Sequence, residues 1–158
     1  MRRKPLRIVV ADNDRNSRHA LHQQLIDAGH KVCRSVLAGE VGMLCELDPP
    51  DVLILDVNLP DMDAFEVCER IRREAGGDDP TIILMTDASD DMIRTYIDQM
   101  ADYAGGDYFL AKPFDPKLLL KLLDQLASER KPADRASAGF PTKVTWPTSR
   151  LSALAQAC

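Results

Sequence analysis

The chain has 158 residues, 45% of them hydrophobic and 28% charged, an ordinary composition for a globular protein and enough chain for one domain with a tail. Its net charge is -5, but residues 131–158 carry four basic residues against Asp134, a net of +3, so residues 1–130 carry -8. An acidic domain argues against direct binding of nucleic acid, which needs a basic surface, and no apolar run is long enough to span a membrane.

The start of the chain and its cysteines bear on the cellular compartment. Residues 1–4 have the basic character of a signal-peptide start, but the apolar run that follows them stops at Asp12. The four cysteines form no CxxC pair, and three of them lie in apolar segments, where buried thiols are expected. We therefore expect a cytoplasmic protein without a metal-thiolate site.

Apolar runs typical of buried strands alternate along the chain with amphipathic runs typical of helices. The first helical run ends at Gly29, the fourth begins near Ser89, and the fifth opens at Asp115-Pro116. The second and third helices are expected at Ala38 to Glu46 and at about Ala64 to Glu74. The predicted strands are Leu6 to Ala11, Val32 to Val36, Val52 to Leu55, Thr81 to Met85 and Tyr108 to Leu110.

Five strand-helix units with short connections predict the fold class. They indicate an α/β protein with a doubly wound parallel sheet and helices on both faces. In the last helix, the leucines expected to face the core are Leu118, Leu119, Leu122, Leu123 and Leu126.

Polar residues stand at the ends of four of these strands. Because the carboxyl ends of parallel strands meet at one rim of a sheet, these side chains can converge there. Carboxylates provide hard oxygen ligands for Mg²⁺, while a hydroxyl and an ammonium suit the oxygens of a phosphoryl group. The residues are Asp12-Asn13-Asp14 after the first strand, Asp56 after the third, Thr86-Asp87 after the fourth and Lys112 after the fifth.

Four segments together resemble the receiver domain of two-component response regulators. They are residues 8–14, residues 51–60 with Asp56 followed by Val-Asn-Leu-Pro, residues 81–86, and residues 104–114 with Lys112-Pro113. The resemblance covers about residues 6–128. It implies a flavodoxin-like, five-stranded parallel sheet of order 2-1-3-4-5 with five helices.

The resemblance assigns the phosphoryl chemistry to specific positions. Asp56 is the expected phosphoacceptor, and Thr86 and Lys112 are expected to bond phosphoryl oxygens. It also implies that the Lys112-Pro113 peptide bond is cis and that Phe109 is the aromatic switch residue that follows Thr86. The protein would be a phosphorylated switch and not an enzyme acting on a separate substrate.

The resemblance likewise implies a Mg²⁺ site. Its ligands would be Asp12, Asn13, Asp56 and the backbone carbonyl of Asn58. Asn13 stands where the family usually has a second acidic residue. An amide oxygen can bind Mg²⁺ but contributes no charge, so we expect weaker binding than in the usual site.

Three departures from the family pattern surround this site. Asp14 and Asp87 are the two carboxylates that could compensate for the missing acidic residue. Asp87 replaces a small residue after Thr86, so it could instead crowd or repel the phosphodonor. Asp61 and Ala64 replace glycines in the loop that follows the third strand, which predicts a reshaped loop.

The resemblance also implies partners. A histidine kinase or a phosphotransfer protein would donate the phosphoryl group. A downstream protein would bind the surface made by the helix near Ser89, the strand Tyr108 to Leu110 and the helix from Pro116, and a homodimer is left open. Residues 1–130 form the expected receiver domain, apparently a stand-alone one. Residues 131–158 form a tail rich in Pro, Ala and Ser that is a flexible linker or a docking segment.

Two alternatives remain at this point. A haloacid dehalogenase-type phosphatase would use Asp12 as its nucleophile, because residues 12–14 match the spacing of its DxD motif. A pseudo-receiver would be an interaction module that takes no phosphate, and Asn13 and Asp87 are the reasons to consider it. Taken singly, Asp12 and Asp14 could simply cap a helix, and Lys112 could be a solvated loop residue.

Overall fold

The computed structural model describes residues 4–74, 80–87 and 106–129. The strands are β1 (Arg7–Ala11), β2 (Lys31–Ser35), β3 (Val52–Asp56), β4 (Thr81–Asp87) and β5 (Tyr108–Lys112). The helices of the described part are α1 (Arg15–Asp27), α2 (Ala38–Leu47), α3 (Ala64–Glu74) and α5 (Pro116–Glu129). The helix expected near Ser89 and the tail from residue 131 lie outside the described residues.

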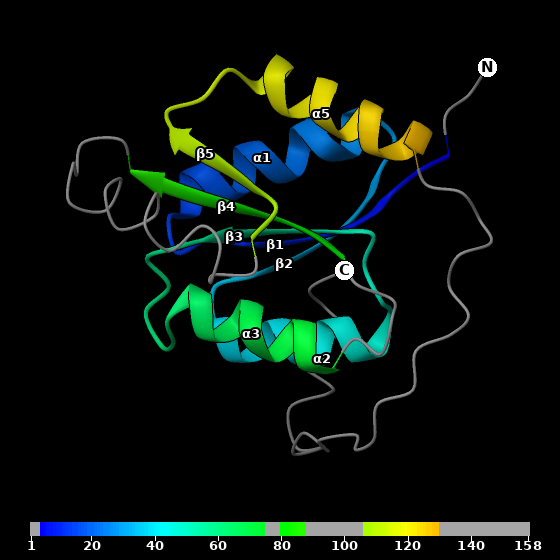
Figure 1. Ribbon diagram of the computed structural model, residues 1–158. Helices are drawn as coiled ribbons and strands as arrows, with labels where there is room; N and C mark the ends of the chain where they lie inside the picture. Colours follow the sequence, from blue (N-terminus) through cyan, green and yellow to red (C-terminus); the bar gives the residue numbers. More distant parts are fainter. Residues whose placement is uncertain (1–3, 75–79, 88–105, 130–158) are drawn as a thin grey trace.

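All five strands are parallel and form one sheet in the order β2-β1-β3-β4-β5, as predicted. Helices α1 and α5 cover one face of this sheet, and α2 and α3 cover the other (Figure 1). The order reverses between β1 and β3. In open α/β sheets the crevice at such a switch point, beyond the carboxyl ends of the strands, is where ligands bind.

The core lies on both faces of the sheet. Every residue of β3 is buried, since a central parallel strand is covered by helices on both sides. Leu53 and Leu55 pack in the layer of α2 and α3, whereas Ile54 packs in the layer of α1 and α5. This alternation, enforced by the two-residue period of a strand, fixes the register of β3 and so the position of Asp56 at its end.

The strand boundaries differ from the predicted ones at the carboxyl ends. β4 continues through Asp87 and β5 through Lys112, because the pairing of the two strands continues from Met85–Leu110 to Asp87–Lys112. Lys112 is therefore held by the sheet instead of following it in a loop. The Lys112-Pro113 bond is cis, as predicted.

The leucine pattern of α5 was predicted correctly only in part. Leu119 and Leu123 are 1% and 0% exposed, but Leu118, expected in the core, is 60% exposed. Leu120, by contrast, is half-buried and packs against the core. Leucines at 118, 119 and 120 are consecutive, so spacing alone left the rotation of the helix open, and packing of Leu119 and Leu123 turns Leu118 toward solvent.

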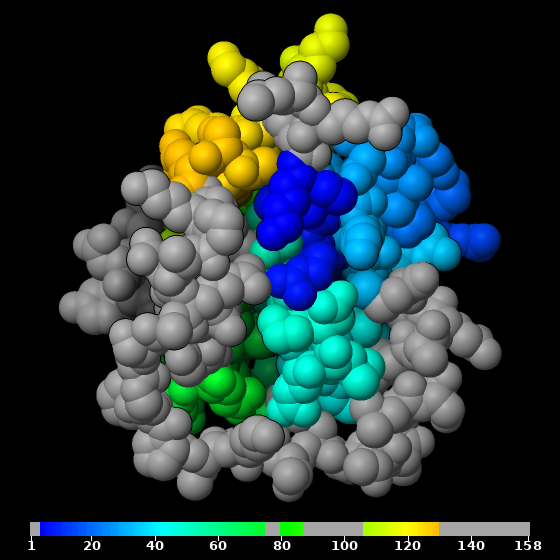
Figure 2. All heavy atoms as spheres, turned by 90° about the vertical axis from the view of Figure 1, so that its right-hand side faces the viewer, coloured from blue at the N-terminus to red at the C-terminus, as the bar shows by residue number. Residues whose placement is uncertain are grey.

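The opposite end of the sheet is held by charged residues. Arg7 donates from Nη1 to Asp48 Oδ1 at 3.0 Å, and its backbone N–H donates to Asp51 Oδ2 at 2.8 Å. Figure 2 views this end, where the dark blue start of β1 lies against the cyan residues between α2 and β3. These contacts tie β1, α2 and β3 together far from the polar residues at the carboxyl ends.

The cysteines agree with the prediction at two positions. Cys45 and Cys68 are free thiols, and burial raises the pKa of each to about 12, so both stay protonated at neutral pH. Cys33 is disulfide-bonded, so the expectation of a free thiol is wrong there. It is only half-buried and lies on the edge strand β2, where its sulfur is less enclosed than in a central strand.

Candidate functional site

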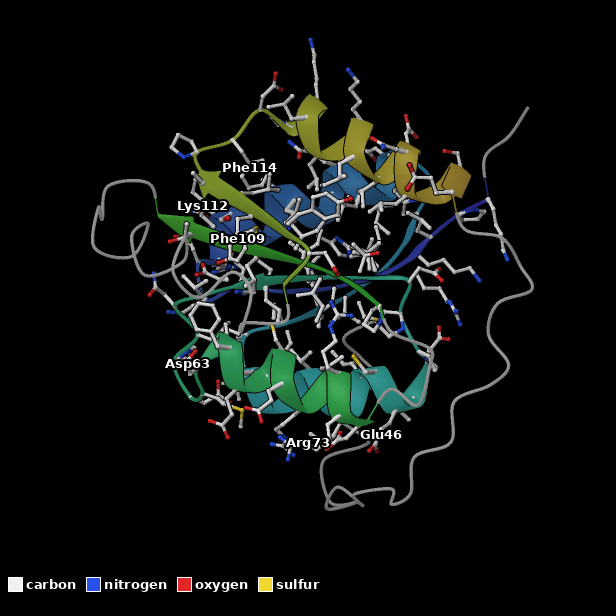
Figure 3. The ribbon with its side chains drawn as sticks, in the orientation of Figure 1. Glu46, Asp63, Arg73, Phe109, Lys112 and Phe114 are labelled. Carbon is white, nitrogen blue, oxygen red and sulfur yellow. The ribbon has the colours of Figure 1, made fainter. Side chains whose placement is uncertain are left out.

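Asp12, Asp56 and Lys112 meet at the carboxyl ends of three strands. Lys112 Nζ donates to Asp12 Oδ2 at 3.0 Å and to Asp56 Oδ2 at 2.6 Å. Asp12 is 0% exposed and Asp56 is 6% exposed, whereas the Lys112 side chain is 21% exposed. Figure 3 shows Lys112 at this end of β5. One ammonium thus bridges two buried carboxylates, and this trio keeps a net negative charge.

Asp12 is held by hydrogen bonds on both carboxylate oxygens. Oδ1 accepts the backbone N–H of Asp14 at 2.8 Å, and Oδ2 accepts the Ser17 hydroxyl at 2.7 Å besides Lys112. Burial raises the pKa of Asp12, but the bonds from Ser17, Lys112 and Asp14 outweigh it and lower that pKa below its ordinary value. Asp12 therefore stays ionised at neutral pH.

The pKa of Lys112 is shifted in the opposite direction to that of Asp12. Burial lowers the pKa of its ammonium, but hydrogen bonds and charge attraction from Asp56 and Asp12 outweigh that effect and raise the pKa above its ordinary value. The lysine is thus a permanent cation at neutral pH. Because its half-buried ammonium is bonded to two carboxylates, the interpretation of Lys112 as a solvated loop residue is wrong.

Asp56 is oriented by the turn that follows β3. Its Oδ1 accepts the backbone N–H of Asn58 at 2.8 Å, and the N–H of Val57 continues the ladder by donating to Met85 O at 2.8 Å. Among the described residues, each oxygen of Asp56 therefore has one donor. The metal-binding role of the Asn58 carbonyl stays a prediction, since the contact with Asp56 is made by the Asn58 N–H.

Asp14 and Asn13 have different roles from Asp12. Asp14 is the N-cap of α1, with Oδ1 accepting the N–H of Ser17 at 2.7 Å, so the capping interpretation is right for this residue. Asn13 is exposed next to it. In the described part of the chain no group of three or more His, Cys, Asp or Glu side chains is arranged to hold a metal.

Thr86 and Phe109, the two residues predicted to form the switch, lie on neighbouring strands. Thr86 is 4% exposed, and its Oγ1 has no hydrogen-bond partner among the described residues. Phe109 is half-buried against the core under α2 and α3, and Figure 3 shows it on β5 close to the Lys112 end. The side chain of Asp87 lies outside the described residues, so the structure does not test the roles predicted for it.

A cleft of about 590 Å³ reaches Asp56 from the surface. Its walls come from one side of α1 and from the turn after β5, with Lys112 and Asp56 between them. Asp12 does not line the cleft. The cleft is therefore open to the Asp56 carboxylate and closed to that of Asp12. The lining residues are Asp14, Ser17, Ala20, Leu21, Gln24, Asp56, Asn58, Lys112, Pro113, Phe114 and Pro116.

Sequence reasoning missed Ser17 and Arg18. Ser17 donates its hydroxyl to Asp12, and Arg18 donates from Nη1 to the Asp12 backbone oxygen at 2.6 Å. A polar residue pair in the first turn of a helix that follows Asp12-Asn13-Asp14 is the signal that could have found them. The structure otherwise brings together Asp12, Asp56 and Lys112, as the sequence predicts.

Asp61 shows how the loop after β3 is reshaped. Its two carboxylate oxygens accept the backbone N–H groups of Ala38 at 2.8 Å and Gly39 at 2.9 Å, which are the first residues of α2. Leu37, the residue at the cap position, supplies no side-chain acceptor. Asp61 therefore caps α2 from the loop after β3 and places its charge at the positive end of that helix.

We expect Asp61→Ala to lower the free energy of unfolding by about 1 kcal/mol or somewhat more, because two N–H groups lose their acceptor. Asp61→Asn should cost less, since its amide oxygen still accepts one of the two bonds. Urea unfolding measures both. Glu46→Gln, at the other end of α2 (Figure 3), removes the same charge and serves as the control. Equal effects of Asp61→Ala and Glu46→Gln would show that the cap contributes nothing.

Fold and site together define an α/β domain of the flavodoxin type, with carboxylates and a lysine gathered at the switch point of its sheet. The sequence pattern of the response regulator receiver domain matches residues 8–124. The chain therefore belongs to the response regulator receiver domain family of two-component systems. No helix in the described residues has both the length and the apolar character that crossing a membrane requires.

Relatives and solved structures agree with this assignment. Response regulator MprA of Mycobacterium avium is 34% identical over 133 residues, which are 84% of this chain and 56% of that protein. The chain thus spans about half the length of the curated relatives it matches. CheY4 of Vibrio cholerae, a chemotaxis response regulator, has a TM-score of 0.68 at 26% identity, covering 78% of this chain and 99% of that one. The BeF3-activated DrrB receiver domain has a TM-score of 0.64 at 26% identity, covering 80% and 100%.

Proposed function

We propose that this chain is a phosphorylation-dependent signalling switch that accepts a phosphoryl group on Asp56 from a histidine kinase or phosphotransfer protein. The observation that carries the proposal is the Lys112 ammonium, which joins Asp56 to Asp12 at the floor of an open cleft. A fixed cation there attracts phosphoryl oxygens and counters the negative charge of the attacking carboxylate.

The proposed step exchanges one bond for another at phosphorus. A carboxylate oxygen of Asp56 attacks the phosphorus of a phosphohistidine, and the P–N bond breaks as the P–O bond of an acyl phosphate forms. The imidazole leaves with the electron pair of the P–N bond and takes a proton from solvent. Lys112 and the buried Thr86 hydroxyl, which has no partner among the described residues, are the groups that can bond the arriving oxygens.

The residues present fit Mg²⁺. Asp12 and Asp56 supply two carboxylates bound to the same ammonium, and Asn13 and the Asn58 carbonyl add uncharged oxygens, all hard ligands of the kind the ion prefers. When bound, the ion would supply positive charge that offsets the negative charge of the phosphoryl group. Asp12 and Asp56 would hold it, and Lys112 would remain the permanent cation.

Phosphorylation with a small phosphodonor and Mg²⁺ tests the proposal. Intact mass should show one phosphoryl group per chain, and hydroxylamine should remove it as an acyl phosphate. Asp56→Asn should abolish the label, whereas Asp63→Asn, a change on the same loop, should leave it intact. An unlabelled parent protein would support the pseudo-receiver. Label that survives Asp56→Asn and disappears only with Asp12→Asn would assign the acceptor to Asp12.

Asn13→Asp should tighten Mg²⁺ binding by on the order of tenfold, because it adds a carboxylate at a position expected to contact the ion. Titration of the metal into the parent and the variant measures this effect. Asp63→Asn is the control, since Asp63 lies away from Lys112 in Figure 3. Weaker binding by Asn13→Asp would mean that another carboxylate already fills the role.

The dehalogenase-type alternative finds no support in the geometry. Its nucleophile would be Asp12, which is 0% exposed and does not line the cleft. Asp56, in contrast, lines the cleft. We therefore propose Asp56 as the acceptor and no separate enzymatic substrate.

The downstream partner is proposed to bind the face that includes β5 and α5. Tyr108 on β5 is 38% exposed and Leu118 on α5 is 60% exposed, so the described part of this face offers apolar groups to a partner. Direct nucleic-acid binding is not proposed for the acidic domain, and the expected cytoplasmic location and the homodimer stay predictions. The role of residues 131–158 also stays a prediction.

A further inference from the structure

A second cavity, of about 480 Å³, lies at the carboxyl end of the edge strand β2. It adjoins β1 on the β2 side, whereas Asp56 lies on the β3 side. Three elements meet around it, namely the first turns of α1, the end of β2 and the start of α2. The polar side chains that line it are Arg15, Arg18, His19, Arg34, Ser35 and Glu40.

The positive charge of this cavity is not balanced. Among the described residues, no ion pair joins Arg15, Arg18 or Arg34 to a carboxylate. The single carboxylate in the lining, Glu40, accepts a hydrogen bond from the Ser35 hydroxyl. Three guanidinium groups around one cavity repel each other, and they stand out in a domain whose net charge is negative. An anionic ligand would relieve that repulsion.

The positive charges around the cavity also affect the pKa of a neighbouring side chain, His22. The pKa of His22 is lowered from its ordinary value, first by burial and then by the positive charges of Arg34 and His19. His22 lies one turn along α1 from His19. The charges of Arg34 and His19 thus act on His22, a residue outside the lining of the cavity.

The lining indicates the chemistry of the ligand. The volume lies within the range of small-molecule sites, and guanidinium groups match phosphate oxygens with two parallel hydrogen bonds. Three guanidinium groups are best neutralised by a ligand that carries more than one negative charge. Among the described residues of the lining, Val36 is the one aliphatic side chain and no Phe, Tyr or Trp is present, so the cavity offers charge and hydrogen bonds more than apolar surface. Ser35 and Glu40 can bond ligand hydroxyls.

We propose that this cavity binds a compact small-molecule polyanion carrying two or more phosphate groups, and that this binding is coupled to the acidic site. The coupling follows from two backbone contacts. Arg18 Nη1 donates to the Asp12 backbone oxygen at 2.6 Å, and the Asp12 N–H donates to the Ser35 backbone oxygen at 3.2 Å. A ligand that engages Arg18 and Ser35 therefore acts on the residue that holds Lys112. Such coupling is reciprocal.

Calorimetric titration with inorganic pyrophosphate tests the binding. Mg²⁺ is removed with EDTA, and ionic strength is held constant. The parent protein should bind one pyrophosphate, and Arg34→Gln should weaken binding by about tenfold, because a charge-assisted pair is lost. Arg73→Gln, which removes the same charge from the exposed face of α3, should leave the affinity unchanged. Asp56→Asn should still bind pyrophosphate, with only the smaller change in affinity that coupling to the acidic site produces, so binding itself does not depend on the proposed phosphorylation.

The other outcomes overturn the proposal. Equal weakening by Arg34→Gln and Arg73→Gln would mean that binding reflects only overall charge. Loss of binding in Asp56→Asn would place the anion in the acidic site. No pyrophosphate binding, together with Arg34-dependent binding of a polyglutamate peptide, would replace the small molecule with an acidic partner segment. The coupling is tested by NMR. The Asp12 amide resonance should shift as pyrophosphate is added, with the same dissociation constant that calorimetry gives. A resonance that does not shift would exclude the coupling.

Discussion

Lys112→Met is expected to lower the free energy of unfolding at pH 7 by about 2–3 kcal/mol. The substitution leaves Asp12 and Asp56, which are 0% and 6% exposed, without their shared cation. Breaking a buried ion pair is costly because an uncompensated charge stays behind. The Lys112 side chain is 21% exposed, so water offsets part of this cost, and the expected value lies at the lower end of the usual range.

The same substitution should reverse the pH dependence of this site. In the parent protein the pKa of Asp12 is lowered, so its contribution to stability is present above its ordinary pKa and is lost as the pH falls through the folded value. Without Lys112, burial and the neighbouring Asp56 act to raise that pKa. The variant is then stabilised by proton uptake as the pH falls, and the stability difference from the parent should shrink between pH 7 and pH 5.

Urea unfolding of both proteins at pH 7 and at pH 5 measures this change. Lys121→Met is the control, because Lys121 is an exposed lysine of α5 and its substitution removes the same charge. It should have a small effect that is similar at both pH values. A stability difference for Lys112→Met that stays constant or widens at pH 5 would mean that the two carboxylates do not depend on the ammonium.

The central residues of the site could be predicted from sequence because each ends a buried strand. A run such as Val52–Asp56 is apolar on both faces, so the carboxylate that ends it marks the rim of the sheet. Strands in a parallel sheet end at the same rim, which brought Asp12, Asp56 and Lys112 together as expected. The fold class followed from the regular alternation of strands and helices, whereas the strand order followed from the resemblance to receiver domains.

Several supporting contacts could not be predicted from local patterns, because they depend on how the elements pack together. Asp61 caps a helix that begins 23 residues earlier, and no local pattern pairs the two segments. Arg18 and Ser17 bind Asp12 only because α1 packs at a particular angle to β1. Leu118 was assigned to the core because spacing cannot fix the rotation of a leucine-rich helix. Tertiary packing decides each of these cases.

Thr86→Val is expected to raise the free energy of unfolding of the unphosphorylated protein by about 1 kcal/mol. The Thr86 hydroxyl is buried, and its Oγ1 has no hydrogen-bond partner among the described residues, so folding removes it from water without replacing the bonds it loses. Valine has nearly the same shape and removes that cost. Thr81→Val, at the amino end of the same strand and only half-buried, is the control and should be close to neutral.

The effect of Thr86→Val should change sign once a phosphoryl group or its mimic is present. Beryllofluoride added with Mg²⁺ is a phosphoryl mimic that can test this at Asp56, the proposed acceptor. It should raise the unfolding temperature of the parent more than that of Thr86→Val, because only the parent has a hydroxyl to donate to the added group. A hydroxyl that destabilises the resting protein and stabilises the modified one biases the two states in opposite directions, as a switch requires. Equal stabilisation of both proteins by beryllofluoride would remove Thr86 from that role.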